Sequence, residues 1–258
     1  MTKAKNSNLQ REISWLLKEK YNGQLTNKAK KDIARLKNGQ PLDYVIGFTD
    51  FLGCRIDLSY KPLIPRVETE FWVKEALDDI KESFDYAQDK TLRVLDIFAG
   101  SGCIGIAVLK NTNTLLCDIA EKDSKLINQI KKNLKLNKID KKRYKLIESD
   151  IFKNIKKKYD LILANPPYIP IKNKNKIQKS TLKYEPKDAL FGGQDGLYFI
   201  KKFLKKAKNY LTENGTIYME FDFLQKGKIE KFLKNFEYKS WQFHKDQFNK
   251  WRYVKIML

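Results

Sequence analysis

Histidine and cysteine, which supply most transition-metal ligands, are almost missing from this chain. Among 258 residues there is one histidine, His244, and three cysteines, Cys54, Cys103 and Cys117. No two cysteines form a Cys-x-x-Cys pair, and a single histidine cannot complete a usual zinc ligand set. We therefore expect no bound metal, and unpaired thiols are typical of proteins in a reducing compartment.

Long apolar runs are also missing. No run reaches the ~18 residues that a membrane helix needs, and residues 1–20 lack an apolar stretch with a small-residue cleavage site. The hydrophobic residues still make up 42% of the chain, which is enough for a sizeable core. The composition predicts a soluble, cytoplasmic protein without a membrane partner, built as one globular domain with a small appendage. We expect it to be a monomer.

Arginine is scarce beside lysine, although the net charge of +21 is high. Arginine is the residue that reads bases and phosphates through two hydrogen bonds, whereas lysine runs such as 156–158 are typical of solvated loops. Charge of this kind is weak evidence for nucleic acid, which stays a less favoured partner. A negatively charged macromolecule would suit this surface.

The hydrophobic pattern divides the chain into three parts. Apolar residues recur at helical spacing over 1–40, which predicts a short helical segment. From residue 43 the pattern becomes β-type, and 41–66 are expected to form a β-hairpin linker. The third part, 67–258, begins with an amphipathic helix over 68–86 and a polar linker over 85–90.

Strands and helices then alternate to the end of the chain. Strands are expected at 92–97, 114–118, 144–148, 159–164, 215–221, 238–243 and 252–257. Helices fit 102–109, 122–136, 196–211 and 224–236. This alternation predicts an α/β fold with a mostly parallel sheet covered by helices on both faces.

A glycine-containing loop follows the first of these strands and leads into a helix. Its residues are Phe98, Ala99, Gly100, Ser101 and Gly102. Glycine lets the backbone turn tightly and approach a ligand without a Cβ in the way. A plain turn would use the same residues, so the loop alone does not decide between the two.

Acidic residues follow at the expected ends of the next two strands. Asp118 comes roughly twenty residues after the loop, where a carboxylate can accept both hydroxyls of a ribose. Asp150, followed by Ile151, comes after the third strand. Asp118 could also be a simple helix cap. The order of strand, glycine loop, helix, strand and acid favours a nucleoside cofactor, because open α/β sheets bind ligands at these strand ends.

The fourth strand leads into Asn165, Pro166, Pro167 and Tyr168. The Asn165 side-chain oxygen and the Pro166 carbonyl can each accept one N–H of a planar NH2 group. That arrangement turns the nitrogen lone pair toward an electrophile and stabilises the positive charge that develops on nitrogen. The prolines hold the loop rigid, and Tyr168 can stack on a flat acceptor. The motif predicts methylation of an amide or exocyclic amine, although in another context it would be only a turn.

This order of features resembles the class I methyltransferases that use S-adenosylmethionine. More specific segments resemble the release-factor glutamine methyltransferases (the HemK/PrmC family). They are PLDYVIG at 41–47, FLG at 51–53, LIPRVETE at 63–70, NPPYIP at 165–170, YEP at 184–186, ALFGGQDGL at 189–197, and the segments 220–225 and 246–252. The resemblance covers the chain from about residue 40 to its end.

The resemblance implies a seven-stranded Rossmann-like sheet and transfer of a methyl group from S-adenosylmethionine, leaving S-adenosylhomocysteine. The acceptor it implies is the amide nitrogen N(5) of the glutamine in the Gly-Gly-Gln loop of peptide chain release factors. It places the glycine loop, Asp118, Asp150, Ile151 and Asn165 at the cofactor. It assigns catalysis to Asn165, Pro166 and Tyr168, which together with Pro167 hold the glutamine.

The chain departs from the family pattern at several points. Phe98 stands where the family usually has glycine, and Val67 replaces the proline of the Arg-Pro-Glu-Thr-Glu signature. Only about 40 residues precede the hairpin, where the family has a longer helical domain. The internal Gly-Gly-Gln at 192–194 is expected to form a wall beside the motif and not the substrate loop. Arg66, Glu68 and Thr69 are expected to shape the entrance to the site.

Other acceptors remain open. Glutamine methylation of a ribosomal protein would use similar chemistry, and adenine methylation of DNA or RNA would use the same NH2 geometry. A non-catalytic nucleic-acid-binding module would fit the charge but would not need the loop and motif. Among the remaining residues, Trp15 and Trp72 are expected to be buried anchors, and His244 is expected to pack and not to catalyse.

Overall fold

The structure is a computed structural model that describes residues 3–84 and 91–258. The polar linker expected over 85–90 lies outside the described residues, as do the last two positions of the helix expected over 68–86. Within the described part that helix is α4, Val67–Phe84.

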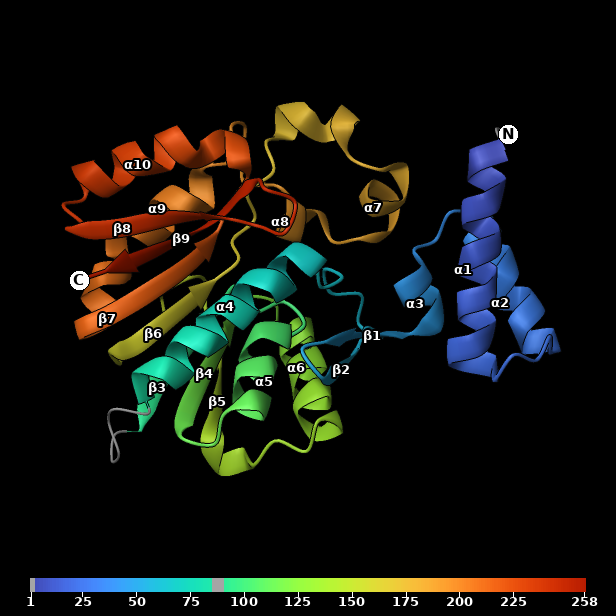
Figure 1. Cartoon of the computed structure of the whole chain (residues 1–258), viewed down its shortest axis with the longest axis horizontal. Coiled ribbons are helices and arrows are strands. Elements are labelled where there is room, and N and C mark those ends of the chain that lie inside the picture. Colours follow the sequence, from blue (N-terminus) through green and yellow to red (C-terminus); the bar gives the residue numbers. More distant parts are fainter. Residues whose placement is uncertain (1–2, 85–90) are drawn as a thin grey trace.

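One seven-stranded sheet dominates the molecule, with the strand order β5-β4-β3-β6-β7-β9-β8 (Figure 1). Its strands are β3 Leu92–Ile97, β4 Leu115–Glu121, β5 Tyr144–Glu148, β6 Tyr159–Ala164, β7 Leu211–Glu220, β8 Ser240–Lys245 and β9 Trp251–Met257. The pairings among β5, β4, β3, β6 and β7 are parallel, and β9 runs antiparallel to both of its neighbours, β7 and β8. The predicted α/β class and the mostly parallel seven-stranded sheet are confirmed.

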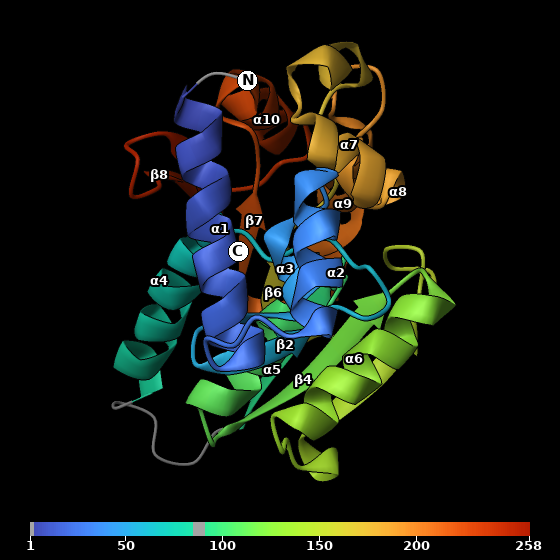
Figure 2. The same cartoon turned by 90° about the vertical axis from the view of Figure 1, so that its right-hand side faces the viewer.

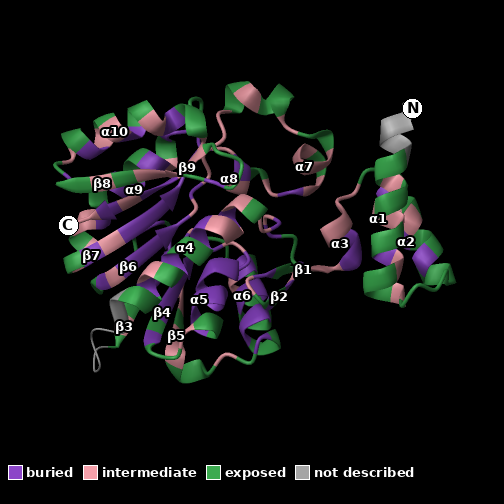
Figure 3. Ribbon diagram, in the orientation of Figure 1, coloured by how far each residue is buried: buried purple, intermediate pink, exposed green. Residues whose placement is uncertain are grey.

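Helices cover both faces of the sheet because side chains of successive strand residues point to opposite faces. Val94 belongs to the hydrophobic cluster that includes residues of α4, α5 Cys103–Asn111 and α6 Ser124–Leu136. Leu95 belongs to the cluster that includes residues of α9 Tyr198–Ala207 and α10 Lys226–Asn235. The central strands and α5 are accordingly the most buried elements (Figure 3). Trp72 of α4 is fully buried in the first of these layers, as expected.

The N-terminal helices α1 Lys3–Tyr21, α2 Asn27–Lys37 and α3 Leu42–Ile46 pack around a separate small core that contains Leu16, Leu36, Val45 and Ile46. In Figure 1 these helices lie to the right of the sheet and the helices that cover it. In Figure 2, which is turned by 90°, they lie in front of the sheet. Trp15 does not join this core: it is 60% exposed, so its expected burial is wrong.

The β pattern expected from residue 43 is wrong for its first part. The chain there forms α3, which buries Tyr44, Val45 and Ile46 and ends at Gly47 with φ 104°. The hairpin follows as β1 Phe48–Phe51 and β2 Cys54–Asp57. A five-residue helix between Pro41 and Gly47 is too short to show helical periodicity, which explains the error.

Side-chain amides of α6 and of the residue that follows it connect the hairpin to the main domain. Asn137 accepts from Arg55 N at 3.0 Å and donates to Arg55 O at 2.8 Å, and Asn133 makes the corresponding pair with Asp57 at 2.8 and 3.3 Å. These buried amides replace a neighbouring strand for the edge of β2. Asn133 also donates to Ser101 O at 3.0 Å, which ties the hairpin to the glycine loop.

Several element ends differ from the expected ones. The strand expected at 114–118 continues to Glu121, and the strand expected at 215–221 begins at Leu211. The chain between β6 and α9 forms η2 Ile171–Lys176, α7 Lys179–Tyr184 and α8 Lys187–Leu190, which the sequence did not predict. Further short 3₁₀ turns are η1 Lys141–Arg143, η3 Lys208–Tyr210 and η4 Phe223–Gln225.

Within residues 3–84 and 91–258, no helix combines the length and apolar character needed to cross a membrane. The same ranges contain no group of three or more His, Cys, Asp or Glu side chains arranged to hold a metal ion.

Gly105 allows α5 to pack closely against the sheet. A Cβ at this position would lie 2.9 Å from Ile119 Cγ1 and 3.0 Å from an Asp96 oxygen. In α10, by contrast, a Cβ on Gly227 would meet nothing within 4 Å.

We expect Gly105→Ala to lower the free energy of unfolding by about 1–3 kcal/mol, because the added methyl group overpacks the interface between α5 and β4. The matched change Gly227→Ala should instead raise it by about 0.5–1 kcal/mol through loss of glycine flexibility. Thermal unfolding of both variants measures the difference. Equal shifts in the same direction would contradict the packing argument.

Candidate active site

Apart from Asp118, the predicted site residues lie at or just beyond the carboxyl ends of the parallel strands. Ile97, the last residue of β3, pairs with Ala164 of β6 on one side and Ala120 of β4 on the other. The glycine loop therefore starts level with Asn165, which follows β6, and with Glu121, which ends β4. Ser149 N bonds to Glu121 O at 2.9 Å, so the segment after β5 joins the same edge.

The glycine loop turns through left-handed backbone conformations. Gly100 and Gly102 have φ values of 55° and 78°, and Phe98 has 63°. The left-handed region strains a bulky residue, so glycine would be the easier choice at position 98. The Phe98 ring packs edge-on against Phe199 and Phe203, at centroid distances of 6.2 and 6.1 Å, and these contacts offset the strain.

Glu121 is the acidic side chain that lies beside the glycine loop. One of its carboxylate oxygens accepts from Gly100 N at 2.7 Å, and the other accepts from the backbone N–H groups of Lys122 and Asp123 at 2.7 and 2.9 Å. The side chain is only partly buried. Glu121 was missed because the strand was expected to end at 118; the apolar pair Ile119-Ala120 was the signal that the strand continues.

Asp118 lies in the middle of β4, and its placement at the end of this strand is wrong. Its carboxylate accepts from the Tyr159 hydroxyl at 2.9 Å and lies 3.9 Å from Lys157 Nζ. It lines a cavity of about 130 Å³ together with Arg93 and Lys145, near the amino ends of the strands. The structure therefore separates Asp118 from the glycine loop, and the hydrogen bond from Tyr159 explains why this acid can be buried within the strand.

Asp150 and Ile151 lie just beyond the end of β5, which stops at Glu148. Asp150 is exposed, whereas Ile151 is buried and has a left-handed φ of 52°. The backbone contact of Ser149 with Glu121 brings both toward the carboxyl edge. Their predicted position near the cofactor loop is compatible with this path of the chain.

A buried carboxyl, Asp96, lies beneath the loop. One oxygen accepts from Gly105 N at 2.8 Å, and among the described residues the other oxygen has no partner. Burial raises the pKa of Asp96 to about 7, partly offset by the Gly105 hydrogen bond. Gly100, Gly102 and Gly105 have the spacing Gly-x-Gly-x-x-Gly. The third glycine of this pattern is typical of close packing between a helix and a sheet, which here is the contact of α5 with β4.

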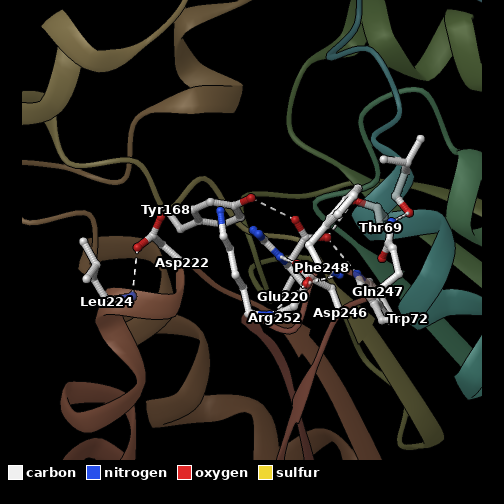
Figure 4. A network of polar contacts seen from close by, with 12 residues as sticks. Thr69, Trp72, Tyr168, Glu220, Asp222, Leu224, Asp246, Gln247, Phe248 and Arg252 are labelled. Carbon is white, nitrogen blue, oxygen red and sulfur yellow. Dashed lines mark hydrogen bonds and ion pairs between the residues drawn. The ribbon is translucent and has the colours of Figure 1, made fainter.

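The Asn-Pro-Pro-Tyr segment is held by a second buried carboxylate, Glu220 at the end of β7 (Figure 4). Glu220 is 1% exposed. It accepts from Thr69 Oγ1 at 2.6 Å, Trp72 Nε1 at 2.7 Å and the Tyr168 hydroxyl at 2.9 Å. Thr69 Oγ1 also accepts from Asn165 Nδ2 at 3.1 Å. One carboxylate thereby connects α4, β7 and the motif.

The titration behaviour of this group follows from its burial. Burial raises the pKa of Glu220, while the hydrogen bonds from Thr69, Trp72 and Tyr168 and the charge of Arg252 act in the opposite direction. Burial, followed by the neighbouring Glu220, raises the pKa of Tyr168 well above its ordinary value. Tyr168 is therefore a neutral phenol that donates its proton to Glu220.

The segment 191–197 supports the backbone of the motif from outside. Gln225 donates to Tyr168 O at 2.8 Å and to Gly196 O at 3.1 Å. A Cβ on Gly192 would lie 2.4 Å from Pro167 O, and one on Gly196 would lie 2.2 Å from Tyr168 O. The internal Gly-Gly-Gln therefore packs as a wall against the motif, as expected.

A cavity of about 220 Å³ opens beside the motif. Its apolar walls are Leu63, Pro166, Ile169, Ile177, Ala189 and Leu190. Arg66, Asn165 and Glu220 supply polar groups to it. Arg66 Nη2 lies 2.7 and 2.8 Å from the two oxygens of Glu185, so the segment before α4 and the segment before α8 are joined at the entrance.

The loop and its surroundings fit a nucleoside cofactor. An ideal Cβ on Gly100 would meet no heavy atom within 4 Å, so the loop is open for close approach of a ligand. The Glu121 carboxylate beside it is of the type that accepts ribose hydroxyls. The strand order, the loop after β3 and the acid at the end of β4 define a class I methyltransferase that uses S-adenosylmethionine as its cofactor.

Comparisons with known proteins agree with this class. Residues 77–188 match the family model "Methyltransferase small domain". The structure of M. jannaschii TYW2 in complex with AdoMet superimposes with a TM-score of 0.51 at 17% identity, covering 81% of this chain and 84% of that one. At this identity the likeness concerns the fold alone.

Closer relatives carry a more specific name. A release factor glutamine methyltransferase from Flavobacterium psychrophilum is 33% identical, covering 87% of this chain and 78% of its own. One from Clostridium botulinum is 35% identical, covering 85% and 76%. The chain belongs to the release factor glutamine methyltransferase family.

Asp96 should make stability depend on pH. Because its folded-state pKa of about 7 lies above the ordinary value of 3.8, the neutral carboxyl stabilises the protein fully below about pH 4. This contribution is lost as the pH rises toward 7. Asp96→Asn stays neutral and can still accept from Gly105, so its stability relative to wild type should rise by about 2–3 kcal/mol between about pH 5 and pH 8.

Urea unfolding of the cofactor-free proteins at the two pH values measures this difference. The exposed Glu213→Gln is the matched control, and its stability relative to wild type should hardly change. A flat difference for Asp96→Asn would show that the buried carboxyl titrates normally.

Proposed function

We propose that this protein transfers the methyl group of S-adenosylmethionine to the side-chain amide N(5) of the glutamine in the Gly-Gly-Gln loop of peptide chain release factors. The observation that carries the proposal is the Asn165 amide, bound to Thr69 and lining an apolar-walled cavity at the end of β6. The names of the relatives support the release factor as the acceptor.

In this proposal the carboxyl edge of the sheet holds the cofactor. Phe98 to Gly102 lie along its methionine part, the Glu121 carboxylate accepts the ribose hydroxyls, and Asp150 and Ile151 border the adenine. Glu121 takes the role first predicted for Asp118. The cofactor supplies a methyl group on a positively charged sulfur, which leaves as a neutral thioether.

The motif prepares the acceptor nitrogen. Asn165 Oδ1 and the Pro166 carbonyl each accept one N–H of the glutamine amide, which directs the nitrogen lone pair at the methyl carbon. As the N–C bond forms and the S–C bond breaks, the nitrogen gains positive charge and the two oxygens stabilise it. One proton then leaves the nitrogen to solvent. Tyr168, held by Glu220, stacks beside the flat amide.

The acceptor is tested by methyl transfer from labelled S-adenosylmethionine to a purified release factor, beside a factor whose Gly-Gly-Gln glutamine is replaced. We expect label on the first only. Asn165→Ala should lower kcat by on the order of 100-fold, because one of the two acceptors of the amide is lost. Label on DNA, RNA or a ribosomal protein in place of the release factor would overturn the proposed acceptor.

The cofactor assignment is tested by two isosteric changes in β4. Glu121→Gln should weaken S-adenosylmethionine binding by about 10- to 100-fold, because hydrogen bonds to a charged acceptor are lost. Asp118→Asn should leave the affinity nearly unchanged. Isothermal titration calorimetry measures both dissociation constants. If Asp118→Asn weakened binding more than Glu121→Gln, Asp118 and not Glu121 would be the residue that binds the ribose.

A further inference from the structure

Thr69 stands between a buried carboxylate and the amide of the motif. Its single hydroxyl is 2.6 Å from Glu220 Oε2 and 3.1 Å from the side-chain amide of Asn165. Thr69 is 2% exposed and Glu220 is 1% exposed, so water does not replace these contacts. The three side chains form a chain of hydrogen bonds that begins in the core and ends at the cavity.

The direction of the protons in this chain follows from Trp72. Its indole N–H lies 2.7 Å from Glu220 Oε2 and can only donate, so this oxygen is an acceptor. The Thr69 hydroxyl therefore gives its one proton to the same oxygen. The Tyr168 hydroxyl donates to the other oxygen, Oε1, at 2.9 Å, so both oxygens of Glu220 act as acceptors.

With its proton used, Thr69 can only accept from Asn165. The Asn165 NH2 group must then face Thr69, and the carbonyl oxygen Oδ1 points away from it. Among the described residues no protein group donates to Asn165 Oδ1. Asn165 lines the cavity, so Oδ1 is the atom left to accept from a ligand there.

We propose that Glu220, acting through Thr69, is the positioning device that fixes the amide orientation of Asn165 and so commits the cavity to an acceptor that donates N–H. This rests on the proposed function in one respect: the acceptor nitrogen carries the N–H groups that Oδ1 receives. With the amide reversed, the Asn165 NH2 would face the NH2 of the acceptor, and two donors would meet.

Two substitutions at position 69 distinguish the effect of the hydroxyl on the orientation of the Asn165 amide from the effect of side-chain packing. Thr69→Ser keeps the hydroxyl and loses a methyl group, whereas Thr69→Val keeps the shape and loses the hydroxyl. Thr69→Val should lower kcat for the release factor by on the order of 10-fold, the effect of one hydrogen bond on an orientation equilibrium. Thr69→Ser should stay within about 3-fold of wild type, and both variants should bind S-adenosylmethionine as wild type does.

A second measurement does not need a substrate. In protein labelled with ¹⁵N asparagine, the side-chain NH2 signals of Asn165 are identified by their loss in Asn165→Ala. In wild type and Thr69→Ser, solvent exchange of these protons should be slow, because the NH2 group is bound to the hydroxyl. In Thr69→Val it should be faster by on the order of 10-fold or more.

The outcomes are distinguishable. Unchanged amide exchange and kcat in Thr69→Val, or equal losses of kcat in Thr69→Val and Thr69→Ser, would overturn the positioning role. If wild type does not label the release factor, the proposed acceptor fails, and the amide exchange still decides the orientation of Asn165. If Thr69→Val does not fold, Thr69→Ala replaces it, because it also removes the hydroxyl: faster amide exchange is then expected, and unchanged exchange would overturn the positioning role.

Discussion

The arrangement of the site depends on the hydrogen bonds to the buried carboxylate of Glu220. Burying a charge is unfavourable by several kcal/mol unless hydrogen bonds replace its hydration. The replacements come from Thr69 and Trp72 on α4 and from Tyr168 after β6, three positions far from β7 in sequence. Satisfying this one group therefore fixes where α4 and the motif stand relative to the sheet.

Close backbone packing gives the site its rigidity. Gly192 and Gly196 allow the following segment to approach Pro167 O and Tyr168 O more closely than any other residue would. Catalysis of methyl transfer relies on groups that are in place before the reaction, since moving them during the reaction would consume the stabilisation they provide. The glycines of 191–197 thus hold the backbone of the motif without lining the cavity beside it.

The backbone strain at Phe98 in the glycine loop is offset by the contacts of its side chain. Phe98 adopts a left-handed conformation that glycine would adopt freely. Its ring packs against Phe199 and Phe203 on α9, the helix on the opposite layer from α5. The loop therefore keeps its path while gaining an aromatic contact to the second hydrophobic layer.

The sequence by itself determined the α/β class, the parallel strands, the glycine loop and the Asn-Pro-Pro-Tyr motif, because each depends on local periodicity or on neighbouring residues. It could not distinguish Asp118 from Glu121: both are acids in one apolar run, and only the strand register shows which one reaches the carboxyl edge. Nor could it join Thr69, Asn165 and Glu220, since these residues are separated by 96 and 151 positions from Thr69. Contacts of that kind arise only when the sheet and its helices pack, so tertiary structure alone decided how the amide of Asn165 is held.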